Sequence, residues 1–138
     1  MATWAVDAFG NDYAQDWAED LAQTSSLEAV ENTLDVALEH PGEMLEAPFA
    51  AEALVAVEVL ARLQGKGGER GEDSAAVDEW VDARKAKARV RTDLAEKAGR
   101  AIERILSEQS ELRELWADSE HYAEWRASVE ALRARISA

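Results

Sequence analysis

The stretch that decides the fold runs from Pro48 to Leu63 and reads PFAAEALVAVEVLARL. A proline suits the first turn of a helix, where its missing N–H would have no partner. The residues that follow are apolar almost all round a helix, and only Glu52, Glu58 and Arg62 interrupt them. Because a helix that is apolar on every side is a buried one, this stretch predicts the central helix of a helical bundle.

Helical periodicity also dominates the residues before this stretch. Apolar residues spaced three and four apart predict one helix that begins at Asn11 or Asp12 and a second that follows Ser25. Directly after the central helix, residues 64–74 (QGKGGERGEDS) contain four glycines and alternating charges. This composition predicts a surface loop, which is too short to be a linker between domains.

Helical patterns resume after the loop. Residues 75–107 predict either one long helix or two helices with a break near 91–93. Two more predicted helices begin at Ser110 and at about Ser119. Strand-like alternation is nearly absent, so the sequence predicts an all-α fold. We expect one compact domain over residues 1–138, a bundle of about six to seven helices around the central one.

Negative charge is concentrated in the first half of the chain. The formal net charge is −14, and the residues from Met1 to Ala61 include 13 acidic side chains and no Lys or Arg. The remaining residues carry 16 acidic and 15 basic side chains. Nucleic-acid binding needs a basic footprint, so we expect no nucleic-acid partner. Two interpretations stay open: the halves fold together and their fields partly cancel, or an acidic face binds a basic partner protein.

The composition also bears on the cellular environment. There are no cysteines, which excludes disulfides and cysteine-ligated zinc and fits a reducing compartment. The most apolar stretch, residues 47–61, is too short to span a bilayer and contains two glutamates. The N-terminus has no basic region followed by a long apolar run, as a secretory signal would. We therefore expect a cytoplasmic protein that does not associate with a membrane.

Several short motifs follow one another in a characteristic order. The first four are Trp4, Phe9-Gly10, Asn11-Asp12 and Asp16-Trp17. Two later ones are the apolar helix of residues 50–63 around Glu58 and SELRELW at 110–116. In this order the motifs resemble the bacterial family known as domain of unknown function 4259. Ala5 stands where members often have glycine, and Tyr13 where an acidic residue is common, which weakens any site that needs a carboxylate there. The resemblance implies a helical protein and no particular activity.

Four carboxylates form the most suggestive polar set: Asp12, Asp16, Glu52 and Glu58. Asp12 and Asp16 lie four residues apart on one helix face, and Glu58 interrupts an apolar run where an unpaired charge is costly. If the four converge, they could hold Mg²⁺ or Mn²⁺ and support a metal-assisted hydrolase. In the alternative, Asp12 caps its helix, Asp16 faces solvent and Glu58 pairs with Arg62. The alternative is favoured, and no cofactor is expected.

Two tryptophans lie outside the predicted inner stripes. Trp4 precedes the first helix and Trp116 ends a short one, so each either packs a chain end onto the bundle or anchors a partner. Packing is the favoured interpretation.

Taken together, the sequence predicts a small acidic interaction or regulatory protein, of immunity type for example, that binds a basic protein. The metal-assisted hydrolase is the alternative function, and both a monomer and a homodimer are compatible with the sequence.

Overall fold

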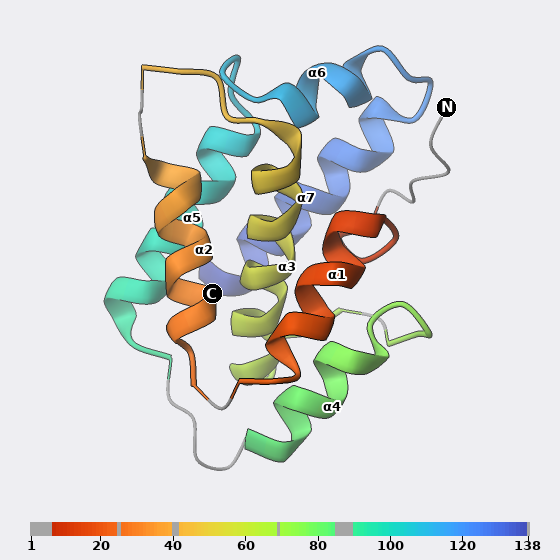
Figure 1. Cartoon of the computed structure of the whole chain (residues 1–138). Coiled ribbons are helices and arrows are strands. Elements are labelled where there is room, and N and C mark those ends of the chain that lie inside the picture. Colours follow the sequence, from red (N-terminus) through yellow and green to blue (C-terminus); the bar gives the residue numbers. More distant parts are fainter. Residues whose placement is uncertain (1–6, 25, 40–41, 69, 85–89, 138) are drawn as a thin grey trace.

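The computed structural model describes residues 7–24, 26–39, 42–68, 70–84 and 90–137, and it is all-helical as predicted (Figure 1). The helices are α1 (Asp12–Leu21), α2 (Glu28–Leu38), α3 (Ala47–Leu63), α4 (Ala75–Arg84), α5 (Thr92–Ile105), α6 (Glu111–Ala117) and α7 (Tyr122–Ser137). Within these residues there is no strand, and one isolated parallel β-bridge joins Leu45 to Ser110. None of the described helices is both long enough and apolar enough to cross a membrane.

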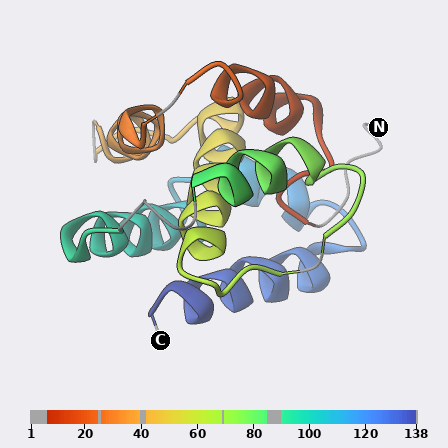
Figure 2. The same ribbon diagram turned by 90° about the horizontal axis from the view of Figure 1, so that it is seen from below.

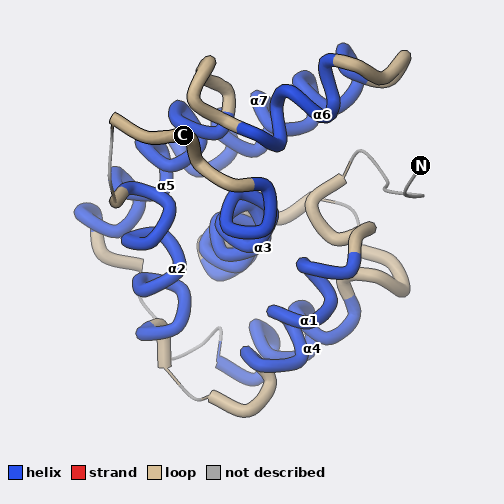
Figure 3. Tube along the Cα trace, turned by 45° about the horizontal axis from the view of Figure 1, so that its top comes forward, coloured by secondary structure: helices blue, strands red, loops and turns tan. Residues whose placement is uncertain are grey.

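Helix α3 is the centre of the molecule, which confirms the interpretation of the apolar stretch. It packs against each of the other six helices, and the tube view shows it end-on with the others around it (Figure 3). Its residues from Ala53 to Leu63 are all buried, including Glu58 and Arg62. Burial on every side explains why this helix has no polar face.

The outer helices pack as neighbouring groups around α3. Helix α1 contacts α4, α2 contacts α5, and α7 contacts both α5 and α6 (Figures 1 and 2). Each turns its apolar stripe inward; in α1 this stripe consists of Ala14, Trp17, Ala18 and Leu21. The spacing by three and four residues places these side chains on one side of the helix. The opposite side of α1 therefore faces solvent.

The helix boundaries agree with the predicted ones in most places. Asn11 rather than Asp12 caps α1, since its Oδ1 accepts a hydrogen bond from the Ala14 N–H at 2.9 Å. The backbone at Arg91 is extended and α5 begins at Thr92, so the alternative with a break near 91–93 is correct. Helix α7 begins at Tyr122, three residues later than the prediction. The predicted cap at residue 25 lies outside the described residues.

Candidate functional site

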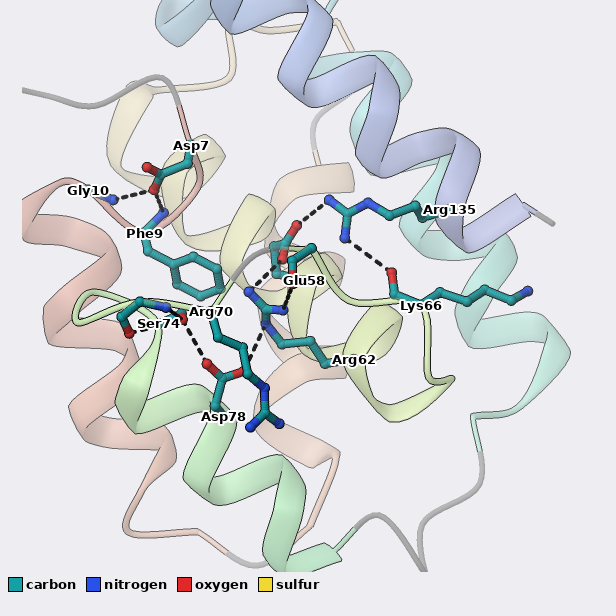
Figure 4. A network of polar contacts seen from close by, with 12 residues as sticks. Asp7, Phe9, Gly10, Glu58, Arg62, Lys66, Arg70, Ser74, Asp78 and Arg135 are labelled. Carbon is teal, nitrogen blue, oxygen red and sulfur yellow. Dashed lines mark hydrogen bonds and ion pairs between the residues drawn. The ribbon is translucent and has the colours of Figure 1, made fainter.

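A cluster of charged side chains lies inside the bundle, and Glu58 is at its centre (Figure 4). Glu58 and Arg62 are one helical turn apart on α3, and each is only 5% exposed. Arg62 Nη2 lies 3.5 Å from Glu58 Oε2, which confirms the predicted pairing of these two residues. On the other side, Arg135 of α7 donates a hydrogen bond to Glu58 Oε1 at 2.7 Å. Two guanidinium groups thus bind one buried carboxylate, and the pair with Arg135 joins α3 to α7.

The cluster continues from Arg62 into α4. Arg62 Nε lies 3.3 Å from Oδ1 of Asp78, whose side chain is also buried. Asp78 Oδ2 accepts a hydrogen bond at 2.7 Å from the hydroxyl of Ser74, just before α4. Arg70, in the loop, lies with its Nε 3.7 Å from Asp78 Oδ1. Buried charges are tolerated when each has an oppositely charged partner, and this arrangement meets that condition.

The loop between α3 and α4 is fixed onto this cluster. Arg62 donates to the Gly68 carbonyl at 3.3 Å, and Arg135 donates to the Lys66 carbonyl at 3.2 Å. The guanidinium of Arg62 lies 5.0 Å from the centroid of the Phe9 ring, a cation–π distance. A Cβ atom at Gly67 would come within 2.6 Å of Arg62, so the loop can approach this closely only because it has glycine there. The sequence predicted a plain loop and gave no sign of this packing.

A pocket of about 360 Å³ opens beside the cluster. Its wall is formed by the segment before α1, by α3, by the loop and by α7: Asp7, Ala8, Phe9, Leu54, Glu58, Arg62, Gly68, Arg70, Gly71, Glu72, Asp73, Ser74, Ser128, Val129, Leu132 and Arg135. Only Glu58 among these residues was a candidate from the sequence. The others come from four separate segments, and their convergence follows from helix packing that no single segment encodes.

The four candidate carboxylates do not converge. Asp12 and Asp16 are exposed on α1, whereas Glu58 lies in the core between two arginines. Glu52 is half-buried, and its burial together with the charge of Asp20 raises the pKa of its carboxyl. Among the described residues, which include all four candidates, no group of three His, Cys, Asp or Glu side chains could hold a metal ion. The shared cation site required by the hydrolase alternative is therefore not formed by these residues.

Trp116 packs inside the bundle. It is buried, and its ring stacks on that of Trp125 with centroids 6.1 Å apart and planes 9° from parallel. The packing interpretation is thus confirmed for Trp116, and as placed here the ring is not available to anchor a partner. Trp4 lies outside the described residues.

The exposed side of α1 forms a second candidate site, which we call the α1 acidic face. It consists of Asp12, Asp16, Glu19 and Asp20, all exposed. Their spacing of i, i+4, i+7 and i+8 places them on one side of the helix, opposite its buried stripe. Within the described part of the chain, no basic side chain forms an ion pair with any of the four.

The acidic residues of α2 have a different environment. Glu31 lies 2.8 Å from Arg91 and 3.2 Å from Lys97, and Asp35 lies 2.7 Å from Lys97. The hydrogen bond with Asp35 contributes most to raising the pKa of Lys97. Charge cancellation between the two halves of the chain thus occurs at the α2–α5 contact and in the core cluster, and among the described residues it does not extend to the α1 acidic face.

Comparison with known proteins identifies the family of this chain but no similar curated protein or solved structure. No curated protein and no protein of solved structure matches the chain. The model of one family, described as domain of unknown function (DUF4259), matches residues 2–128 of the 138. This range includes the α1 acidic face and all of the described core cluster except Arg135. The chain belongs to the DUF4259 family.

Proposed function

We propose that this protein is an acidic interaction domain, which acts in the cytoplasm and binds a basic surface of a partner protein through the α1 acidic face. The observation that carries the proposal is the stripe of four exposed carboxylates on α1 with no ion-pair partner among the described residues. A regulatory or immunity-type role fits this mode of binding, because a protein that binds a basic enzyme through complementary charge can cover the active site of that enzyme.

The electrostatic environment around α1 supports the proposal. Like charges on neighbouring turns of a helix repel one another, so a stripe of carboxylates lowers the stability of the free protein. Burial raises the pKa of Glu52 on α3, and the charge of Asp20 on α1 raises it further, as expected if the negative potential of α1 extends to α3. A cationic partner would relieve this repulsion when it binds. Complementary charges also speed encounter, and the effect weakens as salt screens the field.

An aromatic side chain accompanies the stripe. Tyr13 follows Asp12 directly and is 38% exposed, which makes it one of the large hydrophobic residues at the surface. Tyrosine is enriched among the residues that contribute most to binding at protein interfaces. Carboxylates around an exposed tyrosine would attract a basic surface, and the ring would supply contact area.

Two variants of equal net charge test the proposal. In D12N/D16N/E19Q/D20N the α1 acidic face is neutral, and in E39Q/E43Q/E108Q/E114Q four exposed acids elsewhere are neutral. Each immobilised protein is incubated with lysate of the source cells at low and at high salt, and captured proteins are then purified for titration. We expect a basic protein that binds wild type and the second variant, binds the first at least about tenfold more weakly, and is released by salt. Equal binding by both variants, or binding that salt does not change, would refute the proposal.

A further inference from the structure

The pocket beside the core cluster has two kinds of wall. One side is apolar and is formed by Phe9, Leu54, Val129 and Leu132, all of them buried core residues. The other side carries Arg135, whose side chain is 28% exposed, and Ser128 one turn before Leu132. A pocket of about 300–1,000 Å³ that is mostly apolar with a few polar groups is typical of small-molecule sites. At about 360 Å³ this one is at the small end of that range, and it is more polar than such sites usually are, because more than half of its lining residues are polar or charged.

Arg135 brings more hydrogen-bond donors to this pocket than its bonds to Glu58 and Lys66 use. Both carboxylate oxygens of Glu58 are engaged, Oε1 by Arg135 and Oε2 by Arg62. Arg135 uses one donor for Glu58 and one for the Lys66 carbonyl, and these are its hydrogen bonds to the described residues. A guanidinium group has further N–H donors in its planar fork. A ligand that fits this surplus must bring acceptors, and a carboxylate matches the fork best.

The rim of the pocket limits the charge of such a ligand. Asp7, Glu72 and Asp73 line it and are exposed, so they repel anions, and they repel doubly charged anions more strongly than singly charged ones. The apolar wall at the same time favours a ligand with a hydrophobic body. Inorganic phosphate fits these conditions poorly, because a large fraction of it is doubly charged near neutral pH and it has no apolar part.

We propose that this pocket binds a small organic monocarboxylate, with its apolar body against Phe9, Leu54 and Leu132 and its carboxylate on Arg135. This ligand site is separate from the α1 acidic face, and it does not depend on the function proposed for that face. The carboxylate of the ligand takes the remaining donors of Arg135 and leaves the pair with Glu58 in place.

Phenylacetate serves as the probe in a titration of the wild-type protein followed by amide chemical shifts. We expect saturable shifts at Ser74, Ser128 and Leu132, whereas the neutral isostere phenylacetamide should bind at least about tenfold more weakly. Inorganic phosphate should give no saturable shifts at these amides. If the amide or phosphate binds as well as phenylacetate, or if phenylacetate does not saturate these shifts, the proposal is wrong.

A pair of leucine variants on α7 locates the site. Ser128→Leu fills the pocket without removing any charged group, and Ala127→Leu places the same side chain on the adjacent exposed position outside the pocket wall. We expect Ser128→Leu to weaken phenylacetate binding by about tenfold or more, and Ala127→Leu to leave it unchanged. Equal affinity of the two variants would overturn the assignment of the pocket. The comparison of phenylacetate with phenylacetamide uses the wild-type protein alone, so it remains decisive if a variant does not fold.

Discussion

Glu58 holds two guanidinium groups in the interior, and removing it would leave both without their shared carboxylate. Arg62 is almost fully buried; it would keep its pair with Asp78 but lose its pair with Glu58, and that loss would be costly in the interior. Breaking a buried ion pair by removing one partner typically costs about 3–5 kcal/mol. We therefore expect Glu58→Ala to lower the free energy of unfolding by about this amount, measured by denaturant titration.

The control for this variant is an ion pair at the surface. Glu103 pairs with Arg133, and both side chains are about half exposed. Because water and salt screen such a pair, Glu103→Ala should cost less than about 1 kcal/mol. If the two alanine variants lose the same stability, the core cluster does not stabilise the fold as the contacts indicate.

Glu52 makes stability depend on pH in the opposite way from an ordinary paired carboxylate. Burial first, and then the charge of Asp20, raise the pKa of Glu52 above its ordinary value of 4.5. The folded state therefore binds this proton more tightly than the unfolded state, and ionised Glu52 destabilises the fold once pH exceeds its raised pKa. Glu52→Gln should be more stable than wild type near neutral pH, by less than about 1 kcal/mol because the group is only half-buried.

The gain from Glu52→Gln should shrink as pH falls and vanish below 4.5, where Glu52 is protonated in both states. Thermal melts of the two proteins across this range give the comparison. In wild type, carbon-13 titration of the Glu52 carboxyl should show the raised pKa, and Asp20→Asn should bring it closer to the ordinary value. An unchanged pKa in Asp20→Asn would show that Asp20 has no part in the shift.

The loop between α3 and α4 differs most from its prediction: the sequence predicts a plain surface loop, whereas in the structure the loop packs on Arg62. A Cβ atom at Gly67 would meet Arg62 Cγ and Nη1 at 2.6 Å, and Arg62 is held in place by Glu58 and Asp78. Overpacking of this kind costs about 1–3 kcal/mol, so we expect Gly67→Ala to lower the unfolding free energy by that amount. Gly71→Ala is the matched control in the same loop, since its Cβ would meet no atom within 4 Å. Equal stability of the two variants would mean that the loop does not pack on Arg62.

Helix α3 begins with a cap that another element supplies. Its own N-cap residue, Glu46, makes no side-chain hydrogen bond, whereas Oε1 of Glu111 in α6 accepts from the Ala47 N–H at 2.7 Å. Loss of a cap costs typically about 1 kcal/mol, so Glu111→Ala should lower the unfolding free energy by about 1–2 kcal/mol. Glu114→Ala controls for the charge of the first turn of α6, where both glutamates lie. A similar loss in both variants would assign the effect to α6 itself and not to the cap of α3.

These elements also show what periodicity can and cannot predict. Apolar spacing predicted every helical stretch, because each outer helix buries one stripe and α3 is buried almost all round, but it left open whether residues 75–107 form one helix or two. The cap from Glu111 lies 64 residues away from Ala47 in the chain, and the Arg135–Glu58 pair is separated by 77. Contacts of this range depend on how whole helices pack. The sequence therefore indicated that Glu58 needs a partner and identified Arg62 at i+4, but it did not reveal Arg135 or the pocket.

For the molecule as a whole, the sequence left two interpretations of the acidic first half open: partial cancellation of charge between the halves, and an acidic face for a basic partner. The structure bears on the first of them. The pairs of Glu31 and Asp35 with α5 show the halves folding together with partial cancellation of charge. The α1 acidic face takes no part in this cancellation within the described residues. The composition is sufficient to give the net charge. Which acidic side chains are paired with basic ones and which stay exposed depends on how the helices pack.

This division predicts how salt acts on the whole protein. At about 10 mM ionic strength the screening length is roughly 30 Å, which is long enough for the acids of α1 to repel one another, and at about 150 mM it falls to roughly 8 Å. Wild type carries a net charge of −14, so we expect its melting temperature to rise by about 2–4 °C over this range, measured by calorimetry.

The two charge variants used for the binding test distinguish the effect of net charge on the melting temperature from the effect of where the charges lie. Each removes four negative charges from −14 and leaves −10. If the repulsion is concentrated on α1, D12N/D16N/E19Q/D20N should melt higher than wild type at low salt and gain little from added salt. E39Q/E43Q/E108Q/E114Q should keep most of the wild-type response, because its substituted acids are not clustered on one helix face. Identical salt responses in the two variants would mean that the protein responds to its total charge, and that the α1 acidic face has no special electrostatic character.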